Sequence, residues 1–125
     1  MATVLILEDD MLLLRAIEDK LTREGFRILT SRTFEQAFTQ LALPDTVVDL
    51  VWLDHYLLGK ETGLDFLAKL RSEPRWHETP VFIVSNSANP EMVRQYQALG
   101  ISRYYTKSDF RLEQIADDIK KFLHA

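Results

Sequence analysis

The chain contains no cysteine, and it also lacks long apolar runs and any Gly-, Ser- or Pro-rich linker. Without cysteine, disulfide bonds and thiolate metal sites are both excluded, and this composition fits the reducing cytoplasm. No apolar run approaches the roughly 20 residues that a membrane-spanning helix requires, and the first residues lack the basic flank of a signal peptide. The sequence therefore predicts a cytoplasmic protein without a membrane segment.

Features that bind nucleic acid or nucleotides are missing too. The formal net charge is −4 and no basic cluster stands out, which argues against direct contact with a nucleic-acid backbone. Neither a P-loop nor a G-x-G-x-x-G motif is present, and the three histidines, His55, His77 and His124, have no metal-ligand spacing. With 125 residues, of which 46% are hydrophobic, the chain suits one globular domain spanning residues 1–125.

What the sequence does contain is an alternation of short apolar runs with longer amphipathic segments. Five short runs predict strands at 4–7, 26–30, 47–53, 81–84 and 102–106. Because these runs are largely apolar rather than alternating, they indicate a parallel sheet whose two faces are both covered by helices.

The segments after the strands have apolar residues at helical spacing. They predict helices at 13–21, 34–41, 64–70, 90–99 and 112–123. Gly25 and Gly100 are expected to end the first and fourth helices, Asn89 to cap the fourth, and Thr33 with Gln36 to form a capping box. Right-handed crossovers leave few topologies, and the best fit is a flavodoxin-like α/β fold, a doubly wound (βα)5 sheet in the strand order 2-1-3-4-5.

Charged and polar residues follow the apolar runs directly. The first predicted strand is followed by Glu8 and Asp9, the third by Asp54, the fourth by Ser85 and the fifth by Lys107. In open parallel sheets, ligands bind beyond the carboxyl ends of the strands, at the switch point of the strand order. We therefore expect three carboxylates to share one crevice, with a hydroxyl and an ammonium opposite them.

Carboxylates this close repel one another, so at least one stays protonated unless a cation compensates the charge. Mg²⁺ prefers oxygen ligands and usually keeps several waters, so few protein ligands suffice. A carboxylate beside Mg²⁺ can attack phosphorus and form an acyl phosphate, and Lys107 and Ser85 suit contacts with phosphoryl oxygens. Each residue alone has a structural explanation, since an acid such as Asp10 can cap a helix and Asp54 can be a turn residue. Their joint placement at four strand ends favours a site.

With these residues, the sequence resembles the response-regulator receiver domains of two-component signalling across residues 3–123. The run at 5–10 is similar to the family's apolar strand followed by an acidic pair. The resemblance implies these roles: acidic pair, Glu8 and Asp9; phosphorylated aspartate, Asp54; phosphoryl-sensing hydroxyl, Ser85; active-site lysine, Lys107; aromatic switch residue, Tyr104.

The resemblance also implies a function. A histidine kinase or histidine phosphotransfer protein would donate the phosphoryl group to Asp54, and the domain would catalyse its own phosphorylation and dephosphorylation. Mg²⁺ or Mn²⁺ would be held by Asp9, Asp54 and the backbone carbonyl of Tyr56, with Glu8 acting mainly through water. Phosphorylation would switch binding to a downstream protein target or to an output domain outside this chain.

Four positions depart from the family pattern. Leu58 stands where Pro is usual four residues after the acceptor, and Gly63 arrives one residue late, so the loop after Asp54 is expected to differ in shape. Asn86 replaces a small residue after the sensing hydroxyl, and Ser108 replaces the Pro after the lysine. None of these changes removes a chemical group, so the resemblance implies an active receiver.

The lifetime of an acyl phosphate depends on how water reaches phosphorus. In receivers, Tyr56 and Ser87 would border that approach, and Asn86 lies on the same rim. A Tyr56 ring lying over the phosphoryl group would slow hydrolysis, whereas a ring pointing outward would guard nothing. The sequence leaves both arrangements open.

Two other functions compete with the phospho-acceptor interpretation. A phosphatase or phosphotransferase with an aspartyl-phosphate intermediate often carries a second acid two residues after its nucleophile, but this chain has Tyr56 there. A scaffold receiver would bind partners without phosphorylation, and the intact set of Glu8, Asp9, Asp54 and Lys107 argues against it.

Overall fold

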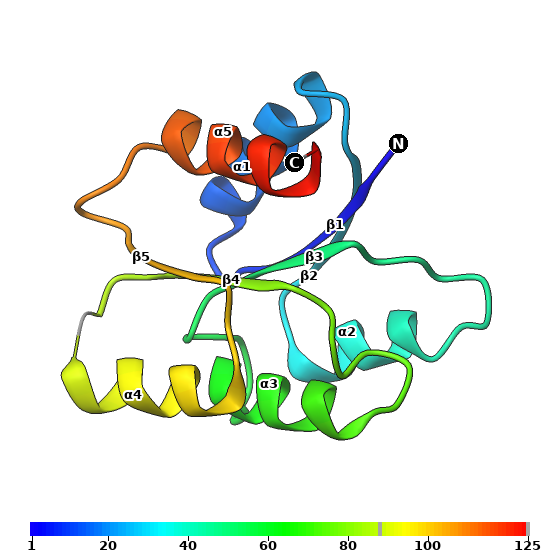
Figure 1. Ribbon diagram of the computed structural model, residues 1–125, viewed down its shortest axis with the longest axis vertical. Coiled ribbons are helices and arrows are strands. Elements are labelled where there is room, and N and C mark those ends of the chain that lie inside the picture. Colours follow the sequence, from blue (N-terminus) through cyan, green and yellow to red (C-terminus); the bar gives the residue numbers. More distant parts are fainter. Residues whose placement is uncertain (88, 125) are drawn as a thin grey trace.

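The computed structural model describes residues 1–87 and 89–124 of the chain. Strands and helices alternate along the sequence, and Figure 1 follows them from blue to red. The strands are β1 (Thr3–Leu7), β2 (Arg27–Ser31), β3 (Leu50–Leu53), β4 (Val81–Ser85) and β5 (Arg103–Thr106). The helices are α1 (Met11–Arg23), α2 (Phe34–Leu41), α3 (Gly63–Ser72), α4 (Pro90–Leu99) and α5 (Leu112–His124). None of the described helices has both the length and the apolarity needed to cross a bilayer.

The five strands form one parallel sheet in the order β2-β1-β3-β4-β5, which confirms the predicted fold. In Figure 1, α1 and α5 cover one face of the sheet, and α2, α3 and α4 cover the other. The register sets Leu7 of β1 beside Leu53 of β3, and Ser85 of β4 beside Thr106 of β5. The strands therefore end together, and the residues that follow them lie at one edge of the sheet.

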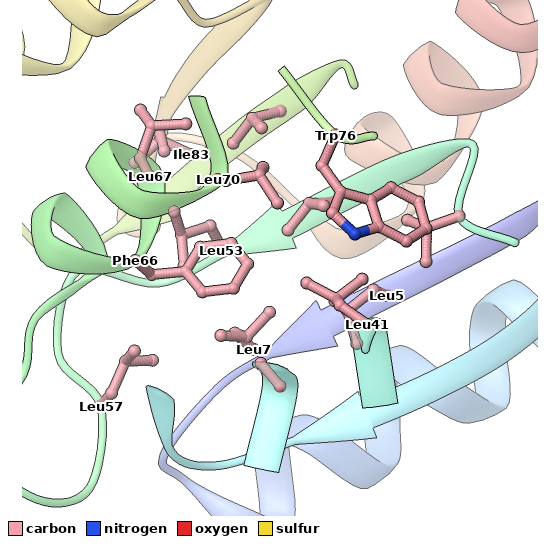
Figure 2. Packing of buried hydrophobic residues seen from close by; sticks show 14 of the residues in the cluster. Leu5, Leu7, Leu41, Leu53, Leu57, Phe66, Leu67, Leu70, Trp76 and Ile83 are labelled. Carbon is pink, nitrogen blue, oxygen red and sulfur yellow. The ribbon is translucent and has the colours of Figure 1, made fainter. Parts of the chain in front are cut away.

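Two apolar cores flank the central strands. In β1, Val4 and Ile6 pack in the core beneath α1 and α5, whereas Leu5 and Leu7 pack in the core beneath α2 and α3. Figure 2 shows the second core, in which Leu5 and Leu7 lie among side chains from the neighbouring strands and helices. A strand buried on both faces has no solvent side, which explains why its sequence is apolar throughout.

Strand boundaries differ from the predicted ones, most of all in β3. This strand begins at Leu50 rather than at residue 47, and Val47 is 61% exposed. The carboxylate of Asp49 accepts a hydrogen bond of 2.8 Å from the backbone N–H of Thr3, so the approach to β3 is held by a side chain. The predicted start of the third strand is therefore wrong, and the bounds of β1, β2, β4 and β5 differ from the predicted ones by one residue.

Helix ends mostly follow the predicted signals. The Asp10 carboxylate caps α1 by accepting hydrogen bonds from the backbone N–H groups of Leu12 at 2.9 Å and Leu13 at 3.2 Å. The Asn89 side chain caps α4 in the same way, with Pro90 in the first turn. Gly100 ends α4 with φ 95°, a conformation that disfavours residues with a Cβ.

The capping box lies at α3, not at α2. The Thr33 hydroxyl accepts a hydrogen bond from the N–H of Gln36, but the Gln36 side chain accepts from the N–H of Arg32 rather than of Thr33, so the predicted box is incomplete. At the start of α3, Thr62 and Asp65 bond reciprocally: the N–H of Thr62 donates to Asp65 Oδ2 at 2.8 Å, and the N–H of Asp65 donates to Thr62 Oγ1 at 3.4 Å.

We predict that Thr62→Ala lowers the free energy of unfolding by about 1 kcal/mol, because α3 loses the acceptor for a terminal N–H. Thr22→Ala is the matched control, since Thr22 is an exposed residue inside α1 and alanine favours helix. Urea unfolding followed by tryptophan fluorescence measures both. Equal unfolding midpoints for the two variants would contradict the capping role.

Candidate functional site

Residues from four strand ends gather at the carboxyl edge of the sheet. Glu8 directly follows β1, Asp54 follows β3, Ser85 ends β4 and Lys107 follows β5. Glu8 and Ser85 are fully buried, and Asp54 is 2% exposed. Carboxylate oxygens of Glu8, Asp9 and Asp54 lie within 4.8 Å of one another. The structure thus brings together the three carboxylates that the sequence analysis expected in one crevice.

Lys107 spans two of these carboxylates. Its Nζ lies 2.9 Å from Glu8 Oε1 and 3.3 Å from Asp54 Oδ2. Its backbone N–H donates to the carbonyl of Ser85 at 2.8 Å, and its peptide bond to Ser108 is trans. Burial by itself lowers the pKa of Lys107, but the hydrogen bond to Glu8 and the charge of Asp54 outweigh it and raise the pKa above its ordinary value. Lys107 is therefore a firmly charged ammonium between two acids.

One ammonium does not neutralise the whole cluster. Burial raises the pKa of Glu8 to about 8 against the opposing effect of Lys107, and Asp9 and Asp54 raise it further. Burial also raises the pKa of Asp54, although Lys107 opposes this. Without a cation, one carboxyl group of the cluster therefore holds a proton at neutral pH, as expected for crowded acids.

Asp54 carries the least satisfied oxygen of the site. Its backbone N–H is held by the carbonyl of Leu7 at 3.0 Å, and its Oδ2 faces Lys107. Among the described residues, its buried Oδ1 has no hydrogen-bond partner. Leaving a buried polar atom unpaired costs about 1–3 kcal/mol, so this oxygen is open to a ligand. The donor set around it consists of carboxylate oxygens, which fits Mg²⁺ or Mn²⁺.

Arg32 supports the acidic cluster from its backbone side. Its Nη2 and Nε donate to the carbonyl of Asp9 at 2.8 and 3.1 Å. The carbonyl of Arg32 in turn accepts from the N–H of Leu58, in the loop that follows Asp54. Arg32, which directly follows β2, thus joins the segment that carries Asp9 to the loop after β3. No local signal in the sequence marks this role, because the contacts join positions far apart in the chain.

The loop after Asp54, whose shape was expected to differ from the family pattern, is held by two glycines. Gly59 adopts φ 91°, which accommodates the turn before Gly63. The N–H of Gly63 donates to the carbonyl of His55 at 2.8 Å. A Cβ on Gly63 would lie 2.6 Å from the carbonyl oxygen of Asp54, so only glycine allows α3 to begin this close to Asp54.

The expected switch residues meet in the loop after β4. The hydroxyl of Tyr104 donates to the carbonyl of Ser87 at 2.6 Å, and the N–H of Ser87 donates to the hydroxyl of Ser85 at 3.3 Å. The Tyr104 ring is half-buried and packs against the Tyr96 ring, with 6.0 Å between centroids. The Tyr104 hydroxyl is therefore bonded to the loop that follows Ser85.

The rim residues differ in exposure. Tyr56 is 52% exposed, and its ring meets the His55 ring edge-on at 4.9 Å between centroids. Asn86 is exposed and Ser87 is half-buried. Among residues 1–87 and 89–124, no hydrogen bond holds the Tyr56 side chain over the carboxylates, so its part in shielding the site stays a prediction.

Comparison with known proteins shows which family this chain resembles. The model of the response regulator receiver domain family matches residues 4–120. The alginate biosynthesis transcriptional regulatory protein AlgB of Pseudomonas putida is 34% identical over 104 residues, which cover 83% of this chain. The chain spans only 22% of the length of that relative.

Two solved structures extend the likeness over nearly the whole chain. The phosphorylated cyanobacterial phytochrome response regulator RcpA has 26% identity and a TM-score of 0.82, and the match covers 97% of this chain and 90% of that one. The Mn²⁺-bound form of the response regulator Rcp1 has 23% identity and a TM-score of 0.85, and the match covers 98% of this chain and 94% of that one.

The raised pKa of Glu8 predicts how stability depends on pH in the absence of metal. Folded Glu8 binds its proton more tightly than the unfolded chain, whose pKa is near 4.5, so this contribution to stability is complete below about 4.5 and is lost as the pH rises through about 8. In EDTA, the free energy of unfolding should therefore fall by a few kcal/mol as the pH rises from about 4.5 to about 8.

Glu8→Gln keeps the side-chain shape but cannot ionise, so its stability should fall less over the same pH range. Urea unfolding of both proteins at a series of pH values gives the comparison. Parallel profiles would show that Glu8 does not titrate in the buried cluster.

Proposed function

The chain belongs to the response regulator receiver domain family, and from that premise we propose that residues 1–125 form a receiver in which Asp54 accepts a phosphoryl group. The donor is a histidine kinase or a histidine phosphotransfer protein. The switch then acts on a downstream protein target or an output domain. The observation that carries this proposal is the buried, unpartnered Oδ1 of Asp54 beside two further carboxylates and Lys107.

Asp54 fits the role of nucleophile. A carboxylate oxygen of Asp54 attacks phosphorus as the P–N bond to the donor imidazole breaks, and the bonding electrons leave with that nitrogen. The Leu7 carbonyl holds the backbone of Asp54, so the carboxylate is fixed before the donor arrives. The charge on the transferred group is spread over its oxygens, and the neighbouring residues must stabilise it.

Asp9, Asp54 and the backbone carbonyl of Tyr56 are the proposed protein ligands of Mg²⁺ or Mn²⁺, with Glu8 reaching the ion mainly through water. The bound ion offsets the negative charge of the carboxylates and of the phosphoryl oxygens. Arg32 holds the backbone of Asp9, and thereby the position of one proposed ligand. A tight pair between Glu8 and Lys107 supports the indirect role of Glu8, since one of its oxygens is already engaged.

Lys107 and Ser85 are the proposed partners of the phosphoryl oxygens. The ammonium has three N–H donors, so Lys107 can keep its ion pair with one carboxylate and still donate to a phosphoryl oxygen. The hydroxyl of Ser85 accepts a hydrogen bond from Ser87 and still has its own O–H to donate. Drawing Ser85 toward the phosphoryl group pulls on the loop to which Tyr104 is bonded.

Phosphorylation would then favour the docked position of Tyr104 on the loop after Ser85. The hydrogen bond from Tyr104 to Ser87 defines this docked member of a conformational ensemble in which the ring would also turn away. A ligand shifts such an ensemble by its difference in affinity for the two states. The surface formed by α4, β5 and α5 is the proposed output face.

Asp54→Asn should abolish phosphoryl uptake, because an amide oxygen is a poor nucleophile. Incubation of the unmodified chain with acetyl phosphate and Mg²⁺ should add the mass of one phosphoryl group in intact-protein mass spectrometry. Asp10→Asn is the matched control, since asparagine caps α1 as well as aspartate does and should leave uptake unchanged. Uptake by Asp54→Asn at the normal rate would contradict the assignment.

The lifetime of the phosphorylated chain tests Tyr56. If its ring excludes water, Tyr56→Ala should lose the phosphoryl group several times faster than the unmodified chain. Tyr56→Asn should be faster still, because an amide can orient water. Loss of radiolabel over time measures the rates. If the Tyr56 variants lose the phosphoryl group no faster than the unmodified chain, Tyr56 does not shield it.

A further inference from the structure

A buried pair links the acceptor loop to α4 outside the carboxylate cluster. Tyr96 of α4 is fully buried, and its hydroxyl lies 2.8 Å from Nδ1 of His55, the residue directly after Asp54. Leaving the buried Tyr96 hydroxyl without a hydrogen-bond partner would be costly. Half-buried His55 supplies that partner, which explains a polar ring at this position.

Gly63 leaves room for the pair. A Cβ at this position would lie 2.5 Å from the Tyr96 hydroxyl and 3.0 Å from Cα of His55. The backbone N–H of Gly63 also donates to the carbonyl of His55. The backbone of His55 is therefore held by α3 while its ring is held by α4, and the segment between Asp54 and Tyr56 is fixed from both helices.

Tyr96 extends the link toward the proposed output face. Its ring packs against the ring of Tyr104, whose hydroxyl donates to the carbonyl of Ser87. The C-terminal end of α4 is also joined to α3, because Arg71 donates to the carbonyl of Gly100 at 2.8 Å and the N–H of Gly100 donates to the carbonyl of Tyr96. The last turn of α4, which carries Tyr96, is therefore bonded both to α3 and to the residue that follows Asp54.

We propose that His55 and Tyr96 are positioning residues that couple the acceptor segment to α4, through the hydrogen bond between the His55 ring and the Tyr96 hydroxyl. The inference rests on the proposed function, since the segment they hold carries the phospho-acceptor and a proposed metal ligand. Occupation of the site and the position of α4 then influence each other equally, because coupling between two sites is reciprocal. The coupling acts in addition to the Ser85 and Tyr104 pair, through the residue that directly follows Asp54.

A double-mutant cycle without metal or donor tests the bond itself. His55→Phe and Tyr96→Phe each keep a ring and remove the polar atom. Each variant should raise the unfolding equilibrium constant roughly tenfold. The double variant should raise this constant by less than the product of the two single factors, because both variants remove the same hydrogen bond. Tyr105→Phe is the control for Tyr96→Phe, since Tyr105 is a buried tyrosine bonded to Asp118 in the other core. Multiplicative effects of His55→Phe and Tyr96→Phe would overturn the proposed bond.

Metal affinity tests the positioning role. Mg²⁺ binding can be followed by the fluorescence of Trp52, two residues before Asp54. Tyr96→Phe and His55→Phe should each weaken Mg²⁺ binding severalfold, whereas Tyr105→Phe should leave it unchanged. Equal Mg²⁺ affinities for all of these proteins would overturn the positioning role.

Amide exchange tests the coupling to α4. On addition of Mg²⁺ and beryllofluoride, a phosphoryl mimic, exchange across residues 90–99 should change in the unmodified chain and much less in Tyr96→Phe. Normal phosphoryl uptake with an unaltered α4 response in Tyr96→Phe would overturn the coupling alone. A chain that binds no Mg²⁺ and takes up no phosphoryl group would instead overturn the proposed function, and the coupling role with it.

Discussion

Repulsion between buried carboxylates is the constraint on which the rest of the site depends. The parallel register of β1 and β3 sets Glu8, Asp9 and Asp54 together at the edge of the sheet. Water is largely excluded there, so the charges are poorly screened and Glu8 keeps its proton to about pH 8 through a raised pKa. Lys107 relieves part of the repulsion, and the remainder favours the divalent cation and the phosphoryl group that we propose for this site.

Carboxylates that repel one another must be held in place, and the contacts that do so are made largely to backbone atoms. Arg32 donates to the carbonyl of Asp9, and Thr62 caps α3 where this helix begins beside Asp54. Gly63 allows that close approach, because a side chain there would meet the carbonyl of Asp54. Rigidity matters chemically, since a prepositioned nucleophile avoids the entropic cost of ordering it when the donor binds.

The fold and the central residues of the site could be predicted because their signals are local. Apolar runs that end in Glu8 or Asp54 identify both the strands and the edge at which they meet. The start of β3 could not be predicted because Val47 is apolar yet exposed. Apolar character alone does not distinguish a buried strand residue from an exposed loop residue. The pair of His55 and Tyr96 escaped it because contacts between distant positions leave no local pattern.

Direct observation of a bound cation tests the central claim, that the carboxylate cluster is an ion site serving Asp54. Crystals grown with Mn²⁺ would locate the ion by its anomalous scattering. The account predicts a peak within bonding distance of the carboxylates of Asp9 and Asp54 and of the carbonyl of Tyr56. A cluster without a peak at saturating Mn²⁺, with Lys107 still the only cation on Glu8 and Asp54, would contradict it.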